Sequence, residues 1–365
     1  MTRLALTFGM LLAILTACAG TGDATPVASA DPTATRQAAT LLTPPPEPRP
    51  LVFPDDEAPH EDMTEWWYFT GHLFDPDGNR YGFEFVIFQV IRGVFPPFYA
   101  SHFAVTDNAT GAFQYAERVG FDGRRETDGD FHLALDDWEM QGAGGEYVLR
   151  ATMEGYAIDL RLTSKDEPVV HNNGIGYMDV GTAGGSYYYS RTDIDVEGTL
   201  TVGGQGLEVS GHAWMDRQWG NFILVDGGSW DWFSLRLDDG SDLMLFELRG
   251  VEDIGDPPDF GTLVRPDGEI VHLPEGSYTI EPLDHWTSVR SGATYPVAWR
   301  VTIPDEELEL DVRAVMPDQE LDTTASTGTI YWEGEVEIAG TSGGELVTGL
   351  GYVELTGYAI ATFSP

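Results

Sequence analysis

The residues best suited to chemistry lie in one short stretch, GHAWMDRQWGN, at positions 211–221. It combines a carboxylic acid at Asp216, an imidazole at His212 and the indole rings of Trp214 and Trp219. A carboxylic acid keeps a proton to donate when burial raises its pKa, and an imidazole accepts a proton near neutral pH. Aromatic faces stabilise a neighbouring positive charge. The stretch therefore predicts either acid–base catalysis beside an aromatic surface or a set of polar side chains with a structural role.

Motifs for other kinds of catalysis are missing from the sequence. The segment HEDMTE at 60–65 has threonine where a zinc-protease helix needs its second histidine. No Gly-x-Ser-x-Gly elbow and no glycine-rich phosphate loop occurs, which disfavours an α/β-hydrolase. The segment DPDGN at 75–79 lacks the spacing of a calcium loop. We therefore expect neither a metal ion nor a cofactor.

Aromatic side chains stand next to one another in EWWYF, at positions 65–69. Successive side chains of a strand point to opposite faces, so all of these rings can be buried only if both faces are covered. They form either ordinary core or the lining of a pocket for an apolar ligand. For the second interpretation, the predicted ligand-binding residues are Trp66, Tyr68, Tyr189, Trp214 and Trp219.

The elements that position these residues are predicted to be short antiparallel strands with few helices. Alternating apolar and polar residues indicate strands at 81–90, 146–153, 156–163, 198–204 and 299–304. Turns are expected at 75–79, 238–242 and 265–269, because Asp-Gly favours the backbone angles of a hairpin.

The body of the chain contains an internal duplication. EWWYFTGHLFDPDGNRYGFEF (65–85) resembles SWDWFSLRLDDGSDLMLFEL (229–248), and VEGTLTV…GHAWMD resembles WEGEVEI…GLGYVE further on. The copies cover roughly 51–224 and 225–365. Each is long enough for one antiparallel barrel of about eight strands. The second copy keeps an acid at Glu354 but lacks the counterparts of His212 and Arg217.

The N-terminus predicts export. Arg3 precedes a short apolar run that ends in LTAC, and this pattern resembles a bacterial lipoprotein signal with Cys18 as the lipidated residue. Residues 1–17 are then the signal peptide, and 18–50, rich in Ala, Thr and Pro, form a disordered tether. The alternative is an ordinary signal peptide with an incidental cysteine. We expect the mature protein to be anchored to the cell membrane or envelope.

The charge of the chain excludes one class of partner. Its 60 acidic residues outnumber its 19 basic ones, which gives a formal net charge of -41. Such a surface repels nucleic acids. We therefore expect no nucleic-acid partner.

Taken together, HEDMTEWWYFTGHL, GHAWMDRQWGN, YWEGEVEI and GYVELTGYA resemble the AttH/carotenoid 1,2-hydratase family, also called hydroxyneurosporene synthase-like proteins. The resemblance spans nearly all of 51–365 and implies an all-β fold of two tandem lipocalin-like antiparallel barrels. It also implies two kinds of function. Some members add water to the terminal double bond of acyclic carotenoids, and others are exported proteins encoded with an ABC transporter.

The resemblance gives the residues of 211–221 two alternative roles. In a hydratase, Asp216 would be the acid, His212 would activate water, and Trp214 and Trp219 would flank the developing carbocation. In the structural alternative, Arg217 would stack on Trp66 or Trp67 at the closed end of a barrel, with Asp216 holding the guanidinium.

From these features we expect an exported, lipid-anchored lipocalin-like protein that binds an apolar molecule, an isoprenoid or a lipid, beside an ABC transporter. The alternative is a hydro-lyase of the carotenoid 1,2-hydratase type, which adds water to a terminal C=C bond. The lipoprotein signal favours binding, because it places the body outside the membrane at whose inner side carotenoids are usually made. Whether the protein catalyses a reaction therefore stays open at the level of sequence.

Overall fold

The computed structural model describes residues 48–125, 130–164, 166–179, 184–222, 229–249 and 260–359. The predicted signal peptide, Cys18 and almost all of the predicted tether lie outside these residues. Helical structure in the described part is limited to two short 3-10 turns, η2 (Asp55–Glu57) and η4 (Pro304–Glu306), as the sequence predicted. No helix among these residues has the length and apolar character needed to cross a membrane.

The first sheet runs in the order β4-β3-β2-β1-β12-β11-β8-β7-β6-β5, and the short strands β9 and β10 pair with β11. All of its pairings are antiparallel, and an isolated bridge between Arg124 and Leu133 nearly closes the circle. Its strands are β1 (Thr64–Phe74), β2 (Arg80–Val90), β3 (Phe98–Asp107), β4 (Ala112–Gly120), β5 (Phe131–Leu135), β6 (Trp138–Ala143), β7 (Glu146–Met153), β8 (Tyr156–Ser164), β9 (Val169–Val170), β10 (Tyr177–Asp179), β11 (Gly184–Val202) and β12 (Gln205–Phe222).

The second sheet has the order β16-β15-β14-β13-β22-β21-β19-β18-β17, with β20 beside β21. It forms a half-barrel whose end strands β16 and β17 are not paired with each other, and together with the nearly closed first sheet it confirms the predicted tandem of antiparallel barrels. Its strands are β13 (Ser229–Leu237), β14 (Asp242–Arg249), β15 (Phe260–Val264), β16 (Ile270–Leu273), β17 (Thr279–Thr287), β18 (Thr294–Ile303), β19 (Leu308–Ala314), β20 (Glu320–Thr323), β21 (Thr329–Ser342) and β22 (Glu345–Leu355).

The duplication seen in the sequence is also a duplication of topology. The order β3-β2-β1-β12-β11-β8 in the first sheet corresponds to β15-β14-β13-β22-β21-β19 in the second. The hairpins β11–β12 and β21–β22 turn at Gly203-Gly204 and Gly343-Gly344, whose φ angles of 58° and 85°, and 57° and 85°, require glycine. The predicted boundary between 224 and 225 lies outside the described residues, between Phe222 of β12 and Ser229 of β13.

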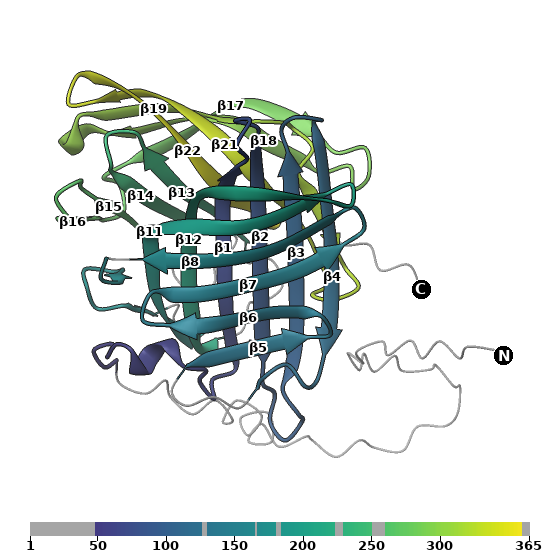
Figure 1. Ribbon diagram of the computed structural model, residues 1–365. Helices are drawn as coiled ribbons and strands as arrows, with labels where there is room; N and C mark the ends of the chain where they lie inside the picture. Colours follow the sequence, from purple (N-terminus) through teal and green to yellow (C-terminus); the bar gives the residue numbers. More distant parts are fainter. Residues whose placement is uncertain are drawn as a thin grey trace, which may run out of the picture. The chain divides into compact units, whose positions relative to one another are not determined.

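The core of the first barrel lies between β1–β3 and β5–β8. Figure 1 shows β5–β8 crossing in front of β1–β4, and the rings of Trp67 and Phe131 meet across this space with centroids 5.9 Å apart. Trp67 and Phe69 belong to this buried cluster, whereas Tyr68 faces the second sheet. The aromatic run is therefore buried on both faces: the lumen covers one and the second sheet covers the other.

Candidate functional site between the two sheets

Strand β12 divides the stretch 211–221 between two environments. Because side chains alternate along a strand, Met215, Arg217 and Trp219 point into the first barrel, and Trp214 and Asp216 point toward the second sheet. The residues that looked like one constellation in the sequence therefore form two separate groups.

Arg217 has the structural position that the sequence suggested, but with a different partner. Its guanidinium lies 3.9 Å from the ring centroid of Trp67, and its Nη2 lies 2.8 Å from Oε1 of Glu65. The side chains of both ion-pair partners are fully buried. The expectation that Asp216 holds the guanidinium is wrong, because neighbouring residues of one strand face opposite sides. Arg217 instead stacks on Trp67 and pairs with Glu65 inside the first barrel.

The predicted ligand-binding residues do not line one common cavity. Tyr189 and Trp219 belong to the packed lumen of the first barrel, where their ring centroids lie 6.1 Å apart. Tyr68 and Trp214 lie in the layer between the sheets, and Trp66 packs at its edge. Two hollows found on the described surface are lined by other residues, around Arg265 and around Phe74.

His212 is not brought to Asp216. Its side chain is 48% exposed, and its Nδ1 lies 3.7 Å from Asp193 and 3.6 Å from Asp195. Four residues of extended strand place it about 13 Å from Asp216. Arg236 already pairs with Asp193 at 2.7 Å. His212 therefore belongs to a charged group at the surface.

Asp216 is buried among hydrogen-bond donors. The hydroxyl of Tyr188 donates to Oδ2 at 2.6 Å, the indole of Trp214 donates to Oδ1 at 2.6 Å, and Ser190 also donates to Oδ1. Burial raises the pKa of Asp216 to about 6, and these donors limit the rise. Asp216 is thus an acid that loses its proton just below neutral pH.

Further buried acids share the layer with Asp216. Glu84 comes from β2 of the first sheet, whereas Glu333 and Glu354 are cross-strand neighbours on β21 and β22 of the second. Tyr68 donates to Oε1 of Glu333 at 2.8 Å. The other oxygen of Glu333, and Oε2 of Glu84, are buried without a hydrogen-bond partner among the described residues.

The remaining contacts of these acids come from the second sheet. The indole of Trp230 donates to Oε2 of Glu354 at 2.9 Å, and Tyr331 donates to Oε1 of Glu84 at 3.5 Å. Trp232 packs edge-on against Tyr68, its sequence counterpart in the first copy, with ring centroids 5.3 Å apart. Aromatic rings therefore surround the carboxyl groups on both sides of the layer.

The protonation states of these acids follow from burial without a counter-charge. No ion pair in the described part of the chain involves Glu84, Asp216, Glu333 or Glu354. Burial and the nearby charge of Glu354 raise the pKa of Glu84 to about 8, and burial raises that of Glu354 to about 7. The pKa of Glu333 rises for the same reason, with added repulsion from Glu354 and Glu84. The layer therefore holds protonated acids next to Asp216, an acid of lower pKa.

Sequence reasoning did not identify Glu84, Glu333 or Tyr331 as site residues. The signals were nevertheless present: Glu84 ends the duplicated aromatic hairpin, and Tyr331 and Glu333 belong to the motif YWEGEVEI. Only the packing of the two sheets shows that these positions meet.

The AttH-like family profile matches residues 44–358. The crystal structure of an AttH protein from Nitrosomonas europaea is 33% identical, with a TM-score of 0.77 over 87% of this chain and 100% of that one. Kievitone hydratase from Nectria haematococca is 18% identical, with a TM-score of 0.70 over 86% of this chain and 95% of that one, and it shares the fold. A search of curated proteins found no significant match. The chain belongs to the AttH-like family of tandem lipocalin-like β-barrel proteins.

Proposed function

We propose that this protein is a hydro-lyase that adds water to a carbon–carbon double bond of an apolar substrate in the layer between its two sheets. The observation that carries the proposal is the group of buried carboxyl groups without a cationic partner, of which Glu84 and Glu333 each have an unpartnered oxygen. An apolar substrate reaches them when side chains of the interface move aside.

The chemistry requires a proton donor and a proton acceptor with separated pKa values. Glu84, with its raised pKa, transfers its proton to one alkene carbon, so the π bond breaks and a C–H bond forms. The neighbouring carbon becomes a cation, which the faces of Trp214 and Trp232 stabilise. Water forms the new C–O bond and gives up a proton to the carboxylate of Asp216. Glu84 is left ionised and Asp216 protonated, so in every cycle Glu84 must regain a proton from water and Asp216 must release one to water.

The comparisons support a hydratase more than a simple carrier. The neighbour from Nectria haematococca is a hydratase by name and shares the fold over most of this chain. The packed lumen of the first barrel offers little support for the alternative of a ligand carried there. His212, the sequence-based candidate for activating water, has no part in the proposal, because it lies at the surface.

The proposal includes the site of action. We infer from LTAC that Cys18 carries a lipid anchor, which would keep the body beside a membrane where isoprenoid and lipid alkenes dissolve. An ABC transporter is a further proposed partner and would supply or remove such molecules. This proposal combines the two alternatives from the sequence: the protein is exported and lipid-anchored, and it is also a hydro-lyase.

The test is conversion of an acyclic carotenoid with a terminal double bond, in detergent and water labelled with heavy oxygen. Mass spectrometry should show one labelled oxygen added per molecule. Glu84→Gln should reduce the rate by about 100- to 10,000-fold, the usual loss for a general acid. Glu345→Gln removes the same charge from an exposed position of β22 and is the matched control. Full activity of Glu84→Gln would disprove the acid role, and recovery of unchanged bound carotenoid from an inert wild-type protein would favour the carrier.

A further inference from the structure

A continuous line of polar side chains connects Glu84 to the margin of the molecule. Nδ1 of His102 lies 2.8 Å from the hydroxyl of Tyr331, which in turn lies 3.5 Å from Oε1 of Glu84. On its other side, Nε2 of His102 lies 3.0 Å from Oγ of Ser326, and Ser326 donates to Oε2 of Glu117. The line thus passes from β4 through the loop after β20 to the buried acid.

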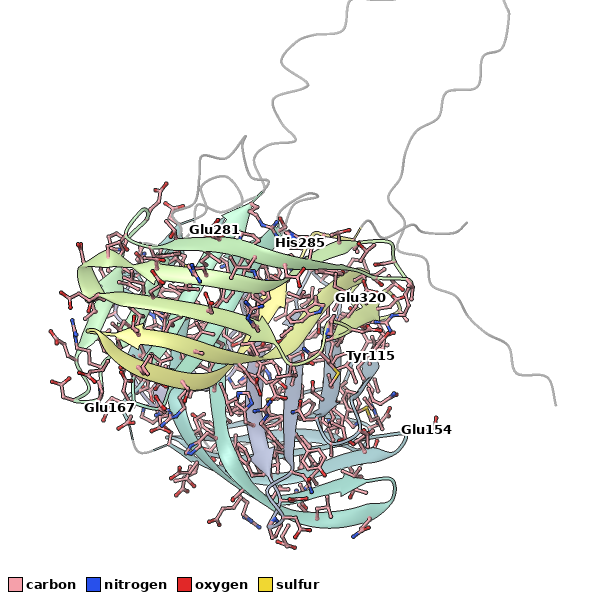
Figure 2. All side chains as sticks on the ribbon, turned by 90° about the horizontal axis from the view of Figure 1, so that it is seen from above. Tyr115, Glu154, Glu167, Glu281, His285 and Glu320 are labelled. Carbon is pink, nitrogen blue, oxygen red and sulfur yellow. The ribbon has the colours of Figure 1, made fainter. Side chains whose placement is uncertain are left out.

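One end of this line of side chains is exposed to solvent, and the other end is buried. Glu117 and Ser326 are partly exposed, whereas His102 and Glu84 are each 1% exposed and Tyr331 is 5% exposed. The solvent-exposed end lies where β4 meets β20. There the backbone N–H of Asp322 donates to the hydroxyl of Tyr115 at 3.0 Å, and Figure 2 labels Tyr115 near Glu320 of β20. Solvent therefore reaches Glu117 but not Glu84.

His102 is suited to passing a proton rather than keeping one. Burial lowers its pKa to about 3, so the ring is neutral at physiological pH. A neutral imidazole has one N–H group and one free nitrogen, and it can accept a proton at one side while it releases one at the other. Both of its nitrogens contact a hydroxyl group, which can also accept and release a proton.

We propose that Glu117, Ser326, His102 and Tyr331 form a proton relay that returns a proton from solvent to Glu84; the proposal rests on the hydro-lyase function above. When Glu117 takes up a proton, it donates to Ser326, whose hydroxyl hydrogen turns to Nε2 of His102. The proton on Nδ1 moves to Tyr331, and the hydroxyl proton of Tyr331 moves to the carboxylate of Glu84. Each hydroxyl gains one proton and loses one, and the imidazole changes tautomer. The net result is one proton moved from water to Glu84, and the imidazole ring and the hydroxyl groups turn back before the next transfer.

The relay can be tested without a substrate, by infrared spectroscopy of the purified protein at neutral pH. A buried protonated carboxyl group has its own C=O stretching band, and the band lost in Glu84→Gln identifies Glu84. Transfer into heavy water shifts the band as the proton is replaced by deuterium. We expect this exchange to slow by about tenfold or more in His102→Gln, a barrier increase of at least ~1.4 kcal/mol.

Matched variants separate a broken relay from a disturbed fold. His171→Gln alters an equally buried histidine, bonded to Ser190 and Thr262 beside Asp216, and should leave exchange at Glu84 unchanged. Ser326→Ala breaks the relay in a partly exposed loop, so it tests the proposal even if His102→Gln does not fold. A loosened structure would speed exchange, because water would then reach Glu84.

The outcomes distinguish this inference from the proposed function. Slower exchange in His102→Gln and Ser326→Ala, but not in His171→Gln, supports the relay. Equal rates in all variants, with the Glu84 band present, overturn the relay and leave the hydro-lyase proposal intact. If Glu84→Gln removes no band of a protonated acid at neutral pH, both proposals fail, since Glu84 then carries no proton.

Discussion

Replacing Glu84 by glutamine should make the protein more stable at alkaline pH than the wild type. The pKa of Glu84 rises from 4.5 to about 8 because it is buried and faces the charge of Glu354. Between these pH values the unfolded chain releases the proton while the folded chain retains it, so wild-type stability falls as pH rises. Each pKa unit corresponds to ~1.4 kcal/mol. The free energy of unfolding of the wild type is therefore lower by about 5 kcal/mol once the pH exceeds the pKa of Glu84 in the folded protein. Glutamine is neutral throughout, still offers an acceptor to Tyr331, and escapes this loss.

The assay is unfolding in urea followed by tryptophan fluorescence. It is repeated at several pH values between the ordinary pKa of Glu84 and its raised pKa in the folded protein. The stability of Glu84→Gln relative to wild type should increase steadily across this range. Glu345→Gln, which removes an exposed charge, should follow the wild type. Parallel curves for Glu84→Gln and wild type would refute the reasoning, because Glu84 would then ionise at its ordinary pH and could not act as an acid near neutrality.

Further predictions follow from the buried ion pair, from Asp216 and from the N-terminus. Glu65→Gln leaves the guanidinium of Arg217 buried without its anion, so we expect the free energy of unfolding to fall by ~3–5 kcal/mol and the melting temperature by about 10 °C; an unchanged melting curve would contradict a stabilising role of this ion pair. Asp216→Asn turns an amide toward the hydroxyl of Tyr188, which should cost ~1–3 kcal/mol in urea unfolding and also stop hydration, whereas normal turnover would exclude Asp216 as the base. Cys18→Ser should release the mature body from membranes into the soluble fraction, and full retention with normal processing would rule out the lipid anchor.

Much of the architecture was predictable because its causes are local. Alternation with a period of two is a property of any strand, and Asp-Gly turns need only their own backbone angles. These signals predicted β2, β7, β8 and the hairpin turns, and the comparison of 65–85 with 229–248 revealed the duplication. Alternation also places Trp214 and Trp219 on opposite faces of β12, so the prediction that both rings line one pocket was wrong.

The site depended on tertiary structure, because its members come from strands far apart in the chain. Nothing near Glu84 in the sequence indicates that β21 and β22 will place Glu333 and Glu354 beside it, or that Tyr331 and His102 will connect it to solvent. The pKa of a carboxyl group depends on the water and charge that surround it, and both are set by the packing of the two sheets. The sequence therefore determined which strands form and which side chains of each strand share a face. Only the packing of the two sheets decided which carboxyl groups are removed from solvent and so retain their protons.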